Sequence, residues 1–140
     1  MSEEATFDPI DQESNERMFG PRAILLCGLS QREQTVVEGF ARKFENLPIT
    51  VAVEQDLSST VGQLVKRADR IGFGQEADLP SLVLMSGLTE AQVHEFMALY
   101  KKADLSKPLW ATLTPTSATW LLSDLLRELE AERRAMSSLR

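Results

Sequence analysis

The order of hydrophobic and polar positions repeats itself along this chain. Two short apolar runs, Ile24–Cys27 and Leu82–Met85, are followed within two residues by a glycine and then by apolar residues at helical spacing. Runs that are continuous rather than alternating predict strands buried on both faces, as in a sheet with helices on each side. A second strand and a second helix follow in each copy. The pattern therefore predicts two degenerate repeats of a strand–helix–strand–helix unit.

The first repeat carries a helix start signal directly after its first strand. Ser30 and Glu33 form a Ser-x-x-Glu capping box, whose side chains satisfy backbone N–H groups left free at a helix start. The predicted buried face of this helix comprises Val36, Val37, Phe40, Ala41 and Phe44. β-branched residues predict a strand at 49–53. The next helix is predicted to be capped by Asp56, Ser58 or Ser59 and to bury Val61, Leu64, Val65 and Ala68.

The second repeat uses the same signals more clearly. Gly87-Leu88-Thr89 matches Gly28-Leu29-Ser30, and Gln92 completes a capping box with Thr89. Val93, Phe96, Met97 and Tyr100 form the predicted buried stripe of its first helix. A strand at 109–113, a Thr-Pro turn at 114–117 and a leucine-rich last helix complete the repeat.

We expect an α/β fold with a small three-layer sheet of four mainly parallel strands. The two strands of each repeat should be neighbours. A pseudo-twofold axis parallel to the strands, between the first strands of the repeats, then gives the order 2-1-3-4. Ligands of open α/β sheets bind beyond the carboxyl ends of the strands where the order reverses. The turns at Gly28 and Gly87 should therefore face one crevice.

A small anionic ligand could bind in this crevice, because two helix N-termini would point free N–H groups into it. Its predicted ligand-binding residues are Gly28, Ser30, Gly87, Thr89, Thr114, Thr116 and Ser117. A structural interpretation explains the same turns: the glycines permit sharp bends, and Ser30 and Thr89 only cap helices. Gly-Leu-Ser is also much shorter than a glycine-rich phosphate motif.

The uneven distribution of charge predicts an acidic N-terminal tail followed by a single domain. Residues 1–19 hold six acidic residues and one arginine, so they carry −5 of the net charge of −6. Such a polar segment predicts a mobile tail, or an arm that binds a partner through Phe7, Ile10 and Met18. The predicted domain spans 20–140, with repeats at 22–71 and 81–136 and a linker at 72–80. An acidic chain without a basic stripe argues against nucleic-acid binding.

No catalytic or metal-binding motif accompanies the repeats, so we expect no cofactor and no enzymatic activity. Cys27, the only cysteine, lies in an apolar strand, where a thiol behaves as a small hydrophobe. His94, the only histidine, has no neighbouring second ligand for a metal. No signal peptide or run of about 20 apolar residues is present. These features predict a cytoplasmic protein without a membrane span, or a stromal one if a plastid-bearing organism is its source.

The second repeat resembles a small bacterial and plastid domain of unknown function. The resemblance rests on LVLMSGLTEAQV and KPLWATLTPTSATWLLSDLLREL, and it covers about the last sixty residues well and the first repeat loosely. In that family an asparagine often follows Thr-Pro-Thr, where this chain has Ser117. The first repeat has Glu54-Gln55-Asp56 in place of that turn, so a site built on it would be single. The resemblance implies the fold element and no activity.

The expected function is a non-enzymatic protein-binding or regulatory module, with the anionic-ligand sensor or enzyme as the alternative. Trp120, Leu121 and Leu122 widen the apolar face of the last helix beyond one stripe, so we expect them to contact another protein. The identity of that partner is left open, and a second copy of the chain is one candidate.

Overall fold

The computed structural model describes residues 16–138, and within them four strands form one sheet in the order β2-β1-β3-β4. The strands are β1 (Ala23–Cys27), β2 (Ile49–Ala52), β3 (Leu82–Ser86) and β4 (Leu109–Thr112). The α-helices are α1 (Gln31–Arg42), α2 (Val61–Val65), α3 (Glu90–Lys102) and α4 (Leu122–Ser138). Two 3-10 turns, η2 (Glu54–Ser58) and η3 (Ser117–Thr119), precede α2 and α4. The predicted α/β class and strand order are confirmed.

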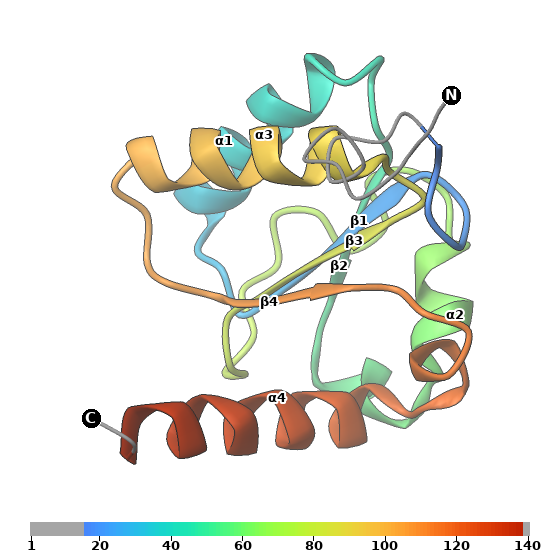
Figure 1. The fold of residues 1–140 in the computed structure, drawn as a ribbon, viewed down its shortest axis with the longest axis vertical. Coiled ribbons are helices and arrows are strands. Elements are labelled where there is room, and N and C mark those ends of the chain that lie inside the picture. The colour runs from blue at the N-terminus through green and yellow to red at the C-terminus, as the bar shows by residue number, and fades with distance from the viewer. Residues whose placement is uncertain (1–15, 139–140) are drawn as a thin grey trace, which may run out of the picture.

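Helices cover both faces of the sheet, with α1 and α3 on one side and α2 and α4 on the other (Figure 1). Alternate residues of one strand therefore enter different cores. Ile24 and Leu26 pack toward α1 and α3, whereas Leu25 and Cys27 pack toward α2 and α4. All residues of β1, β2 and β3 are buried, as their continuous apolarity predicts. None of the helices in residues 16–138 has the length and hydrophobicity that a membrane-spanning segment requires.

The two central strands are neighbours but run antiparallel. β1 pairs parallel with β2 and β3 pairs parallel with β4, whereas Ala23 lies opposite Ser86 and Cys27 opposite Leu82. The sheet is thus mainly parallel, but the predicted direction of the pseudo-twofold axis is wrong. Because α1 and α3 share one face and β1 and β3 are antiparallel, the axis runs perpendicular to the plane of the sheet rather than along the strands.

The linker between the repeats explains this direction, because α1 holds it near the carboxyl end of β1. Gln34 is fully buried. Its side-chain oxygen accepts a hydrogen bond from Gly74 N–H at 2.7 Å, and its side-chain nitrogen donates to Gln75 C=O at 2.8 Å. The Glu76 carboxylate accepts a hydrogen bond from Gln31 N–H at the start of α1. Ser81 then donates to the C=O of Gly28. The chain therefore begins β3 where β1 ends.

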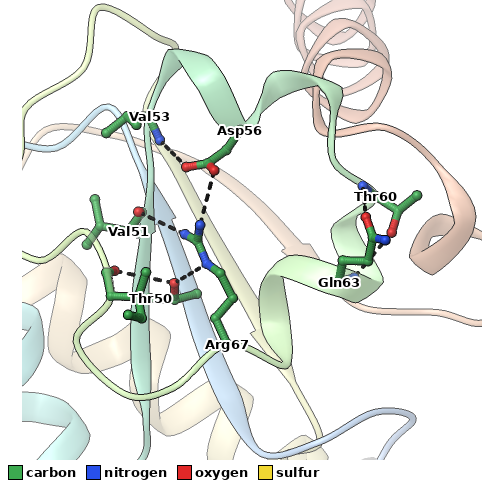
Figure 2. A network of polar contacts seen from close by, with 8 residues as sticks. Thr50, Val51, Val53, Asp56, Thr60, Gln63 and Arg67 are labelled. Carbon is green, nitrogen blue, oxygen red and sulfur yellow. Dashed lines mark hydrogen bonds and ion pairs between the residues drawn. The ribbon is translucent and has the colours of Figure 1, made fainter.

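The helix starts follow the capping signals, with one correction. Ser30 and Thr89 cap α1 and α3 in complete capping boxes, as predicted. The cap of α2 is Thr60, whose partner is Gln63 (Figure 2), rather than Asp56, Ser58 or Ser59. Asp56 instead accepts a hydrogen bond from the N–H of Val53 at the start of η2. Ala68 lies beyond the end of α2 and is exposed.

Candidate functional site

The crevice predicted between the turns at Gly28 and Gly87 is not formed. Because β1 and β3 are antiparallel, their carboxyl ends lie at opposite ends of the sheet. A Cβ at Gly28 would lie 2.3 Å from the C=O oxygen of Leu79, just before β3. A Cβ at Gly87 would lie 2.5 Å from that of Gly20, just before β1. The seven predicted ligand-binding residues are therefore divided between opposite ends of the sheet, with Gly28 and Ser30 at one end and the other five at the other.

Each glycine turn has a structural explanation in its own position. Gly28 and Gly87 have φ values of +70° and +71°, a region that strongly favours glycine, and neighbouring backbone fills the space beside each. Ser30 and Thr89 accept hydrogen bonds from N–H groups of their own helices. These contacts support the structural interpretation of both turns.

Residues that end the predicted acidic tail cover the second of these turns. Met18 N–H donates to Leu88 C=O, and Gly87 N–H donates to Phe19 C=O. The Arg17 guanidinium donates to Gly87 C=O at 3.0 Å. Residues 17–19 thus contact this turn, whereas Phe7 and Ile10 lie outside the described residues, and the mobile tail stays a prediction.

The other predicted site residues separate into a local turn and a divided hydrophobic patch. Thr114 and Ser117 hydrogen-bond each other, with 3.1 Å between their hydroxyl oxygens, while Thr116 accepts a hydrogen bond from the Thr119 hydroxyl. In the predicted partner-binding patch, Leu122 is fully buried in the core beneath α4. Trp120 packs partly against the same core, and Leu121 is 38% exposed. Of these three residues, only Leu121 is exposed.

The polar network around Arg67 closes one edge of the sheet (Figure 2). Its guanidinium contacts Asp56 at 3.0 Å, the Thr50 hydroxyl at 3.1 Å and the C=O of Val51 at 3.1 Å. Charge-assisted bonds of this kind are strong when the partners are shielded from water. Two of the contacts tie the segment after α2 to β2 and the third ties it to η2, so the network has a structural role.

Every outward-pointing backbone group of β2 has a partner within the first repeat. The N–H of Ile49 donates to the Asp69 carboxylate, and its C=O accepts from Arg70 N–H. The N–H of Val51 donates to Ile71 C=O, and its C=O accepts from Arg67. The segment after α2 thus returns along β2 and satisfies the edge.

The equivalent edge of β4 is open. Leu109 and Leu113 donate to β3, so the parallel ladder points the N–H and C=O groups of Trp110 and Thr112 away from the sheet. Within residues 16–138 no backbone or side-chain group hydrogen-bonds these outward groups. Unpaired groups on an edge strand are a ready template for another extended chain.

The lengths of the last helices explain the difference between the two edges. In the first repeat α2 ends at Val65, and the chain turns back along β2. In the second repeat α4 continues to Ser138, running beside β4 toward the loop that precedes it (Figure 1). The described residues therefore include no segment of the second repeat that could cover β4.

Two grooves flank the open edge. The larger has a volume of about 740 Å³ and is lined by Tyr100, Lys101, Asp104, Leu105, Lys107, Pro108, Trp110 and Arg133. The smaller, of about 330 Å³, is lined by Pro108, Leu109, Trp110, Leu129, Glu132, Arg133 and Met136. Both reach Trp110 and Arg133, so they meet at the edge strand.

One wall of the larger groove is tied to the first repeat. Tyr100 donates to Ser106 C=O at 2.8 Å, and Ser106 donates through its N–H and its hydroxyl to the Glu33 carboxylate. Partial burial alone would raise the pKa of Glu33, but the hydrogen bonds from Ser106 and Ser30 outweigh it and lower that pKa. Burial, with the nearby Glu33 charge, raises the pKa of Tyr100 to about 12, so its phenol stays a donor at neutral pH.

The side chain with the clearest nucleophilic chemistry is inactive in this environment. Cys27 is fully buried. Burial, together with the charges of Glu54 and Asp56, raises its pKa to about 12, so the thiol stays protonated at neutral pH. Among the described residues, no group of three His, Cys, Asp or Glu side chains could hold a metal ion.

The edge and its grooves were not predicted from the sequence. Trp110 packs edge-on against Tyr100, with ring centroids 5.1 Å apart. One signal in the sequence could have indicated the open edge. The last helix of the second repeat continues, whereas in the first repeat the helix ends early and the chain turns back along its strand. Lys101, Lys107 and Arg133 fit no recognised motif.

Comparison with known proteins adds a family match for the second repeat. No curated protein and no solved structure matches the chain. The segment that matches a family, residues 81–136, begins directly before β3 and ends within α4, so it includes the open edge and most of both grooves. Residues 81–136 match the family described as a domain of unknown function, DUF3783.

Proposed function

We propose that this chain is a non-enzymatic protein-binding module that adds an extended segment of another protein to the open edge of β4. Strand addition uses backbone hydrogen bonds for affinity and pockets beside the edge for alternate side chains. The observation that carries the proposal is the contrast between the closed edge of β2 and the open edge of β4.

The flanking grooves fit the geometry of an added strand. Successive side chains of a strand point to opposite faces of its sheet. Trp110 packs with the core beneath α1 and α3, whereas Leu109 packs with the core beneath α2 and α4. A segment beside β4 would therefore direct alternate side chains into the two grooves.

The alternative of a small anionic ligand loses the crevice on which it was based. A ligand could no longer contact Ser30 and Thr89 together, because their turns lie at opposite ends of the sheet. Both hydroxyls also accept capping hydrogen bonds. The protein-binding function is therefore the better supported of the two.

A substitution at Thr112 tests the proposal. Proline there removes one outward N–H while leaving the bonds that Leu109 and Leu113 donate to β3, whereas valine retains the N–H. Peptides selected from a displayed random library on the wild-type chain should bind Thr112→Val with similar affinity. Binding to Thr112→Pro should weaken about tenfold or more, because a hydrogen bond is lost and the ring occupies its place.

Amide NMR during the titration locates the binding. Peptide addition should shift the Trp110 and Thr112 resonances and slow their exchange with solvent. An unchanged spectrum of each free variant apart from β4 verifies folding. A library that yields no binder, or a binder that tolerates Thr112→Pro, would contradict the proposed function.

A further inference from the structure

We propose that the segment bound at β4 is acidic, with carboxylates on the side chains that face the larger groove and aliphatic residues on those that face the smaller. This inference rests on the proposed function and specifies the chemistry of the partner. It follows from the charges and the apolar surfaces that lie on the two sides of the open edge.

The larger groove is basic at its rim and aromatic at its floor. Lys101, Lys107 and Arg133 line it with one acidic residue, Asp104, while Tyr100 and Trp110 supply the aromatic surface. None of the ion pairs described within residues 16–138 uses these three cations. A glutamate side chain could lay its methylene groups on Trp110 and direct its carboxylate to the rim.

The smaller groove favours an aliphatic side chain. Leu109, Leu129 and Met136 provide its apolar lining, and Met136 is 66% exposed. Its only charged lining residues are Glu132 and Arg133, one acidic and one basic, so it has no excess of either charge. Alternating acidic and aliphatic residues would therefore match the two sides of the edge.

A second copy of the chain is a poorer fit to the same surface. Two β4 edges that paired with each other would bring two larger grooves together, each lined by three basic residues and one acidic residue. Like charges that face each other across an interface oppose association. An acidic extended segment supplies the opposite charge as well as the strand.

Synthetic peptides that differ only in charge test the inference. Valine alternates with glutamate, glutamine or lysine in three otherwise identical peptides. Their binding is followed by the fluorescence of Trp110 in a Trp120→Phe chain, which leaves one tryptophan. We expect the glutamate peptide to bind about tenfold or more tightly than the glutamine peptide, and the lysine peptide to bind least. Salt should reduce this preference, because it screens charges at exposed sites.

Matched variants assign the preference to the groove. Arg133→Gln and Lys101→Gln should each reduce the advantage of the glutamate peptide. Arg134→Gln and Lys102→Gln should not, because these exposed neighbours line neither groove. Thr112→Pro should weaken the glutamate and glutamine peptides alike.

The possible failures are distinguishable. Equal affinity for the three peptides would overturn the acidic partner and leave the proposed function intact. Binding of none of them would overturn both. Displacement by millimolar free glutamate, with no effect of Thr112→Pro, would indicate a small-anion site instead. A stable dimer in light scattering that dissociates in Thr112→Pro would assign the edge to a second copy.

Discussion

Glu33 shows how one side chain can serve both repeats. One carboxylate oxygen completes the capping box at the start of α1, and the other accepts two hydrogen bonds from Ser106. Ser106 lies between α3 and β4, in the loop beside the larger groove. The same carboxylate therefore secures a helix start in one repeat and a groove wall in the other.

Replacing Glu33 with glutamine should make the stability of the protein less dependent on acid. The folded pKa of Glu33 is lowered from its ordinary value of 4.5, so its stabilisation is complete above that value and is lost as pH falls through the folded pKa. Glutamine resembles the protonated acid and can still cap. Denaturant unfolding at neutral pH should show a loss of about 1 kcal/mol, a small value because the site is partly exposed.

The difference between wild type and Glu33→Gln should then shrink as the pH falls below 4.5. Glu95→Gln, on an exposed position of α3, provides the matched loss of one carboxylate. A difference in unfolding free energy that stays constant down to pH 3 would show that the charge on Glu33 is not what stabilises its contact with Ser106.

At the scale of elements, α4 has two halves with different roles. Leu122, Leu125 and Leu126 bury its first half against the sheet. Residues 131–138 are all exposed, although Arg133 and Met136 line the grooves. The second half therefore contributes surface to the candidate site and little to the core.

Deleting residues 131–140 should separate these roles. The unfolding free energy should change by no more than about 1 kcal/mol, since none of the deleted helical residues has a buried side chain. Binding of an acidic peptide at β4 should weaken much more, because Arg133 and Met136 are removed from the grooves. Loss of cooperative unfolding in the shortened chain would instead show that this half supports the fold.

The caps and apolar runs could be predicted because their signals are local. Ser30 with Glu33 and Thr89 with Gln92 form capping boxes over four residues, and the structure has both. The equivalent signal of Thr60 and Gln63 was present but was masked by three earlier candidates, Asp56, Ser58 and Ser59. Leu122 was misassigned to the surface because a helix that starts after a 3-10 turn does not continue the phase of the residues before it.

At the scale of the molecule, strand direction could not be predicted from the strands themselves. A continuous apolar strand such as Leu82–Ser86 is equally buried in either direction. Direction depends on the linker, which Gln34 and Ser81 hold near the carboxyl end of β1. These contacts join residues far apart in the sequence, so no local pattern reveals them. The open edge is equally non-local, because it depends on what the chain does after α2 and after α4.

Hydrogen exchange measured by NMR on the free protein should reveal this asymmetry directly. The outward amides of Ile49 and Val51 donate to Asp69 and Ile71, so they should be protected. The outward amides of Trp110 and Thr112 should exchange much faster, since the described residues offer them no acceptor.

The inward amide of Leu113 controls for the stability of β4, because it donates to Met85 C=O in the same ladder. If Leu113 is protected while Trp110 and Thr112 exchange rapidly, β4 is formed and its edge is open. Equal protection of all three would mean that something already occupies the edge. The contrast between the two edges, on which the proposed function depends, would then disappear.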